Sequence, residues 1–100
     1  MFANYPATFQ REQGFTEADW RRTLPGAVRD CPIDLTVPGL ASVQVGGGTL
    51  RLTWQVLSPR QVALMRMPRL AVHYCFDGVS DEQRKAFMRY FDLYTQRGGG

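Results

Sequence analysis

The hydrophobic residues between positions 50 and 76 alternate with polar ones in two separate stretches. The first stretch places apolar side chains at Leu50, Leu52, Trp54 and Val56. The second places them at Leu70, Val72, Tyr74 and Phe76. Strict alternation is typical of a β-strand with one buried face. The pattern therefore predicts two strands whose apolar side chains point inward. The intervening residues are expected to point outward, namely Arg51, Thr53, Gln55, Arg69, Ala71, His73 and Cys75.

Two other stretches have the period of an amphipathic helix. Thr16 is a suitable N-cap with Asp19 three residues later, and the Pro25-Gly26 pair is expected to end or kink this helix. Ser80 and Gln83 have the spacing of a second capping box. The helix that follows carries one apolar stripe, which consists of Phe87, Tyr90, Phe91 and Tyr94.

The connecting segments predict short turns and hence an antiparallel meander. Residues 40–45 form a plausible strand before the Gly46–Gly48 turn. Residues 58–60 (Ser-Pro-Arg) are predicted to form a turn, and residues 61–67 a further strand that Pro68 ends. The pattern does not decide which face of residues 61–67 is buried.

These elements predict an α+β fold made of one domain, residues 1–100. A three- to four-stranded antiparallel sheet is expected to carry two helices on one face, in the order helix, strands, helix. Residues 1–14 have no clean period and are expected to be a partly irregular segment. Residues 97–100 are expected to be a flexible tail.

The composition is that of an ordinary globular chain, with 44% hydrophobic and 21% charged residues. We find neither an apolar run long enough to span a membrane nor a signal-peptide pattern, which predicts a cytoplasmic protein with no membrane partner. Cys31 and Cys75 suit that compartment as free thiols, although one disulfide between them remains open.

The charges are distributed unevenly along the chain. No Asp or Glu occurs from Leu35 to Phe76, the stretch that forms the whole predicted sheet. Arg51, Arg69 and His73 fall on its outward face. This layout would suit an anionic partner, although strands disfavour acidic residues in any case.

Candidate chemistry is weak. His73 and Cys75 share one strand face, but a zinc site needs four ligands, and nothing orients the histidine for catalysis. The Gly46–Gly48 loop precedes a strand instead of the helix that a phosphate site requires. Gly98–Gly100 resemble a diglycine handle, yet they follow a helix, where glycine is ordinary. We therefore predict no metal, cofactor or catalytic residue.

The pattern favours a small non-enzymatic interaction protein. Its outer sheet face is expected to bind a protein partner or a second copy, through Arg51, Arg69 and His73 and through the apolar area of Met65 and Met67. The alternative is a nucleic-acid-binding protein whose arginines contact phosphates. The stacking aromatics that single strands require are predicted to lie inward. An enzyme or a C-terminally activated carrier comes third.

Overall fold

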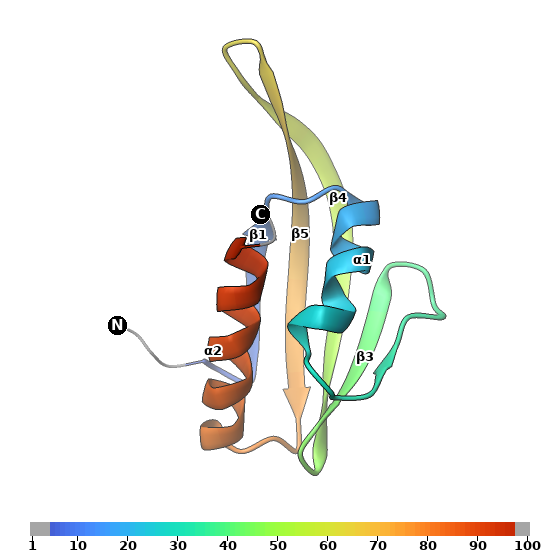
Figure 1. Cartoon of the computed structure of the whole chain (residues 1–100), viewed down its shortest axis with the longest axis vertical. Helices are drawn as coiled ribbons and strands as arrows, with labels where there is room; N and C mark the ends of the chain where they lie inside the picture. Colours follow the sequence, from blue (N-terminus) through green and yellow to red (C-terminus); the bar gives the residue numbers. More distant parts are fainter. Residues whose placement is uncertain (1–4, 98–100) are drawn as a thin grey trace.

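The computed structural model of the chain describes residues 5–97 and has five strands and two helices (Figure 1). The strands are β1 (Thr8–Gln13), β2 (Ile33–Asp34), β3 (Leu40–Val45), β4 (Gly48–Val62) and β5 (Met65–Asp77). The helices are α1 (Glu17–Ala27) and α2 (Asp81–Arg97). Among the described residues, no helix has the length and apolarity needed to cross a membrane.

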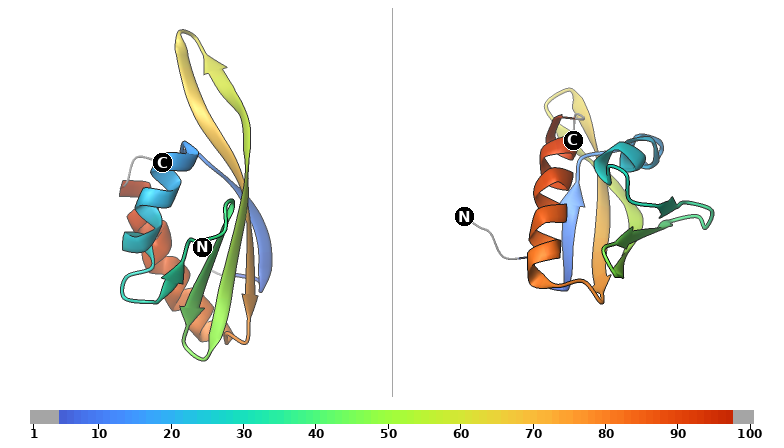
Figure 2. Two further views of the ribbon diagram at one scale, coloured as in Figure 1. Left: turned by 90° about the vertical axis from the view of Figure 1, so that its right-hand side faces the viewer. Right: turned by 60° about the horizontal axis from the view of Figure 1, so that its bottom comes forward.

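The strands form one antiparallel sheet in the order β1-β5-β4-β3-β2. Both helices pack on the same face of this sheet, and the other face is uncovered (Figure 2). The predicted α+β class, antiparallel meander and one-sided helical layer are confirmed. The sheet is wider than the meander because β1 and β2 add to its two edges, and the element order is β-α-β-β-β-β-α.

The prediction of an irregular N-terminal segment is wrong for residues 8–13, which form β1 beside β5. The pairing runs from Thr8 opposite Cys75 to Gln13 opposite Leu70. The sequence hides this strand because Arg11 and Gln13 are polar although they lie on the inner face. Both are satisfied there, since Arg11 pairs with Asp92 and Gln13 donates to the Tyr74 hydroxyl at 2.7 Å.

The core lies between the inner sheet face and the two helices. All the predicted inward residues of β4 and β5 are buried except Val56, which is 62% exposed. Val56 lies beyond Thr53, the last residue of β4 that pairs with β3, at the start of the part of β4 that protrudes from the sheet. Trp20 and Leu24 of α1 complete the core and are fully buried.

Helix α2 buries a stripe slightly rotated from the predicted one. Phe91 is fully buried as expected, but Met88 and Thr95 are buried with it. Tyr94 is 37% exposed, since it lies over α1 instead of the sheet. Its hydroxyl lies only 2.1 Å from the position that a Cβ on Gly26 would take, so a larger residue there would require the Tyr94 ring to move.

Both predicted helix starts are confirmed. The amide of Asp19 donates to Thr16 Oγ1 at 3.1 Å, and the amide of Gln83 donates to Ser80 Oγ at 3.2 Å. The expectation that Pro25 and Gly26 end or kink α1 is close to the observed end, since α1 includes both residues and ends one residue later, at Ala27. The predicted tail begins at the last residue of α2, and Gly98–Gly100 lie outside the described residues.

Candidate functional site: the β-hairpin arm and the outer sheet face

Strands β4 and β5 extend far beyond the other strands as a two-stranded arm, here defined as residues 56–69. The last β4 residue paired with β3 is Thr53, and the last β5 residue paired with β1 is Leu70. Beyond these points β4 and β5 pair only with each other. Figures 1 and 2 show this arm protruding past the ends of the helices.

The arm corrects the sequence interpretation of residues 58–68. Ser58-Pro59-Arg60 is not a turn but an irregularity inside β4, where the register shifts between Leu57 and Arg60. Pro68 does not end β5, which continues to Asp77. Proline lacks a backbone N–H and is tolerated on edges and at bulges, and both strands of the arm are edges because no third strand flanks them.

The arm exposes an unusual amount of apolar side chain. Leu64 at its tip is 98% exposed, Met65 64%, Val62 48% and Met67 47%. Isolated exposed apolar residues are ordinary on protein surfaces, whereas a contiguous group often marks an interaction site. These four residues are contiguous, because Val62 is paired with Met65, Leu64 lies in the turn between them, and Met67 follows Met65 on the same face of β5.

The tip of the arm has a strained backbone. Ala63 has a φ of 53°, a left-handed conformation that residues with a Cβ adopt at a cost of about 1 kcal/mol or more. The side-chain amide of Gln61 donates to the Ala63 carbonyl at 3.1 Å and helps to hold this turn. The turn presents the Leu64 side chain directly to solvent.

The strand register places all five residues predicted to bind a partner on one face of the sheet. Met65, Met67, Arg69 and His73 alternate along β5, in which no irregularity is found, so they share a face. Arg51 stands opposite Cys75 on β4 and joins them. This is the uncovered outer face, which continues from the body of the sheet onto the arm.

The cations of this face differ in how firmly they are held. Arg69 is fixed, since its Nε donates to the Ser58 carbonyl at 2.9 Å and its Nη1 lies 3.2 Å from Glu12 Oε2. Arg60 Nη2 approaches the same carboxylate oxygen at 3.8 Å. Arg51 on this face is exposed and makes no ion pair with any residue between 5 and 97, and the same holds for Arg66, which lies on the opposite face of the arm.

His73 lines a hollow of about 280 Å³ on the outer face, together with Gln10, Thr53, Trp54, Gln55 and Ala71. Cys75 lies on the same face, but Cys31 packs against the core on the opposite side of the sheet. Both cysteines are free. Within residues 5–97, no three His, Cys, Asp or Glu side chains are grouped as metal ligands would be.

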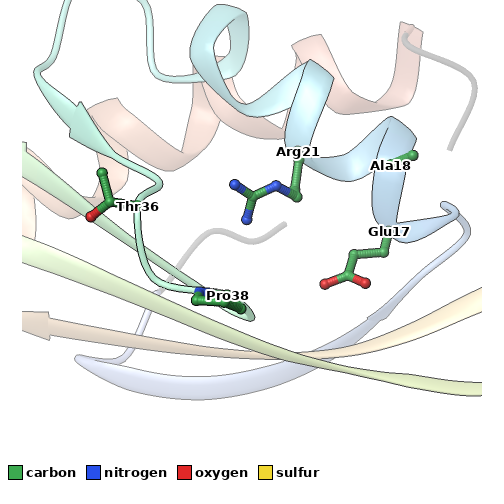
Figure 3. A pocket seen from close by; sticks show the side chains of 5 residues that line it. All are labelled: Glu17, Ala18, Arg21, Thr36 and Pro38. Carbon is green, nitrogen blue, oxygen red and sulfur yellow. The ribbon is translucent and has the colours of Figure 1, made fainter.

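A second hollow, of about 370 Å³, separates the start of α1 from the connection between β2 and β3 (Figure 3). Glu17 and Arg21 project into it from α1 (Figure 3). Both make structural contacts, because Glu17 accepts from Trp54 Nε1 at 3.0 Å and Arg21 donates to the Leu35 carbonyl at 2.7 Å. These contacts attach α1 to the sheet and to the β2–β3 connection and give both residues a structural role.

A cluster of titratable side chains attaches β1 to α2. Arg11 makes two bonds to Asp92, of 2.6 and 3.1 Å, and Tyr5 donates to Asp92 at 2.8 Å. Burial raises the pKa of Tyr5, and the hydrogen bond to Asp92 raises it further. Burial lowers the pKa of Arg11, but the Asp92 carboxylate more than offsets this and leaves it raised. The fully occupied pairing indicates a structural role.

Sequence reasoning identified Met65 and Met67 but missed Val62, Leu64 and Glu12, which complete the surface. One signal was available: residues 56–69 contain three arginines, no acid and no aromatic residue, together with six Val, Leu and Met side chains. If residues 56–69 are interpreted as one hairpin that includes both prolines, these side chains fall together on it. The role of Glu12 could not be found, because it depends on the unpredicted pairing of β1 with β5.

Comparison with known proteins identifies no relative. No protein-family model matches the chain, and no significant match was found among curated proteins or solved structures. The interpretation of the arm and the outer face therefore depends on their own geometry and chemistry.

Proposed function

We propose that the chain is a small non-enzymatic interaction protein that binds another protein chain through its arm and the adjoining outer sheet face. The observation that carries this proposal is the contiguous apolar surface of Val62, Leu64, Met65 and Met67 on a projecting hairpin. Leaving such a surface in water is unfavourable by roughly 25 cal/mol per Å² of apolar area. A protein partner would cover it.

The residue types of the arm also favour a protein partner. Methionine and arginine are enriched at protein interfaces, and methionine adapts its shape to a partner surface.

Cys31 and Cys75 lie on opposite sides of the sheet as separate thiols, which is compatible with a reducing compartment. The proposal therefore places the protein in the cytoplasm.

Nucleic-acid binding is the second candidate, and the absence of any acid between Leu35 and Phe76 favours it. Two structural features weaken it. Trp54, Tyr74 and Phe76 are buried on the inner face, so the outer face offers no stacking ring from these residues. Glu12 already neutralises Arg69 in part. Binding through three or four phosphate contacts would show a log–log salt slope of roughly −2.5 to −3.5.

A photoreactive amino acid in place of Leu64 tests the proposed function in cells. Leu64 is almost fully exposed at the tip of the arm, so the substitution leaves the core intact. On illumination we expect a covalent adduct with a protein, identified by mass spectrometry of the cross-linked peptides. The same amino acid at Lys85, which is exposed on α2, is the matched control and is expected to give no such adduct.

The class of molecule attached at position 64 decides between the candidates. An adduct that contains protein peptides supports the proposed function, whether they come from another protein or from a second copy. Adducts that contain only nucleotides or lipid, or equal protein adducts at positions 64 and 85, would contradict it.

A further inference from the structure

The arm presents cations beside its apolar side chains, and this combination restricts the partner. Arg60 is paired with Met67 across the arm, so their side chains share a face, and Arg69 lies two residues after Met67 on the same face of β5. A partner that covers the methionines must therefore also cover part of these arginines. A buried cation is costly unless a carboxylate or other acceptor pairs with it.

Glu12 shows where such a carboxylate would bind. Its Oε2 atom lies 3.2 Å from Arg69 Nη1 and 3.8 Å from Arg60 Nη2, so one carboxylate bridges both guanidinium groups at the base of the arm. Because the Nε of Arg69 is held by the Ser58 carbonyl, its guanidinium stays in place if Glu12 leaves. The terminal nitrogens are then oriented to receive another carboxylate.

The backbone of the arm restricts how a partner can attach. Strand addition to a sheet edge uses a row of free N–H and C=O groups. Pro59 in β4 and Pro68 in β5 each remove one N–H from the arm, and prolines on edges discourage pairing with a further strand. Recognition must then depend on side chains, namely the apolar group and the arginines.

From these observations we propose that the arm binds a protein segment or groove whose apolar surface is bordered by carboxylates, and that Glu12 occupies the position of one of them until the partner binds. This inference depends on the proposed function and specifies the chemistry of its partner. A second copy of the chain fits less well, because two arms placed together would juxtapose six arginines with only two Glu12 carboxylates. A membrane surface fits less well too, because the arm carries no aromatic residue of the kind that anchors proteins at lipid interfaces.

The test uses a phage-displayed library of random dodecapeptides selected on the purified full chain. We expect the enriched peptides to combine apolar residues with an excess of Asp and Glu over Lys and Arg. A synthetic copy of the most enriched peptide is then titrated against the protein and its variants by fluorescence anisotropy. Far-ultraviolet circular dichroism verifies that each variant is folded, as expected for substitutions at exposed positions.

Three substitutions separate the parts of the proposal. Met65→Asp is expected to weaken peptide binding about tenfold or more, since it places a carboxylate in the apolar contact. Arg60→Glu is expected to weaken it strongly, whereas Arg89→Glu, the same charge change on the exposed surface of α2, should have little effect. Glu12→Gln is expected to tighten binding about two- to fivefold, the range that a partly exposed ion pair contributes. Glu82→Gln on α2 is its control.

Several results would overturn the inference. The selection could enrich neutral or basic peptides, or only peptides that bind Met65→Asp as well as they bind the parent chain. In the titrations, Glu12→Gln could bind the acidic peptide no more tightly than the parent chain does. Sedimentation velocity measures the oligomeric state of the chain in parallel. A dimer that Met65→Asp dissociates would also overturn the inference. In that case a second copy is the occupant, and the proposed function stands. If the chain is monomeric and position 64 gives no protein adduct in cells, both proposals fail.

Discussion

Replacing Trp20 with alanine is expected to lower the free energy of unfolding by about 3–5 kcal/mol, the usual cost of deleting a fully buried large aromatic side chain. Trp20 is completely buried and connects the two layers of the fold. Its ring meets Trp54 of the sheet edge-on at 6.2 Å and Phe91 of α2 at 6.1 Å. The cavity left by alanine would therefore lie at the point where α1, α2 and the sheet meet.

Urea unfolding monitored by circular dichroism measures this effect. Leu64→Ala serves as the comparison, because it also truncates a large apolar residue but at a fully exposed position. It is expected to change the free energy of unfolding by no more than about 0.5 kcal/mol. If the two variants unfolded at similar urea concentrations, the assignment of Trp20 to the centre of the core would be wrong.

Replacing Asp92 with alanine is expected to cost about 1–3 kcal/mol, because it leaves Arg11 half-buried without its carboxylate. The estimate stays below that for a fully buried pair, since the Arg11 and Asp92 side chains are 32% and 22% exposed. Tyr5 would lose its acceptor as well. The result should be a weaker attachment of β1 to α2.

A double-mutant cycle with Arg11→Met isolates the contribution of the pair. The double variant Arg11→Met/Asp92→Ala is expected to be more stable than the sum of the single effects predicts, because no unpaired charge remains. Hydrogen exchange should locate the loss in β1, whose amides would exchange faster in Asp92→Ala. Strict additivity of the two changes, with unaltered exchange in β1, would show that the ion pair contributes nothing to this attachment.

The body of the sheet could be predicted because its strands have one buried and one exposed face. Burial of Leu50, Leu52, Leu70 and Val72 imposes alternation on the sequence, and alternation can be recognised without any homologue. Strand β1 escaped prediction for the opposite reason. Its inner face includes Arg11, whose burial becomes acceptable only when Asp92, 81 positions away, pairs with it.

The candidate site was predicted in part. Met65, Met67, Arg69, His73 and Arg51 were expected near the outer face, and the register places them there together. The arm itself was not predicted. Residues 58–60, which contain Pro59, indicated a turn, and Pro68 indicated the end of a strand. Both prolines are tolerated because no further strand pairs with the outer edges of the arm. That absence arises because β3 and β1 end before the arm begins, and no local sequence signal indicates it.

Oxidation of methionine in intact cells tests most directly whether a protein covers the arm. The measurement compares the rates at which dilute peroxide converts Met65, Met67 and Met88 to sulfoxides, in cells and in the purified chain at low concentration. Met88 is fully buried and serves as an internal reference that should react slowly in both. The two arm methionines are expected to react rapidly in the purified chain and several-fold more slowly in cells. Equal, rapid oxidation of Met65 and Met67 in both settings would show that the arm is not covered and would contradict the account.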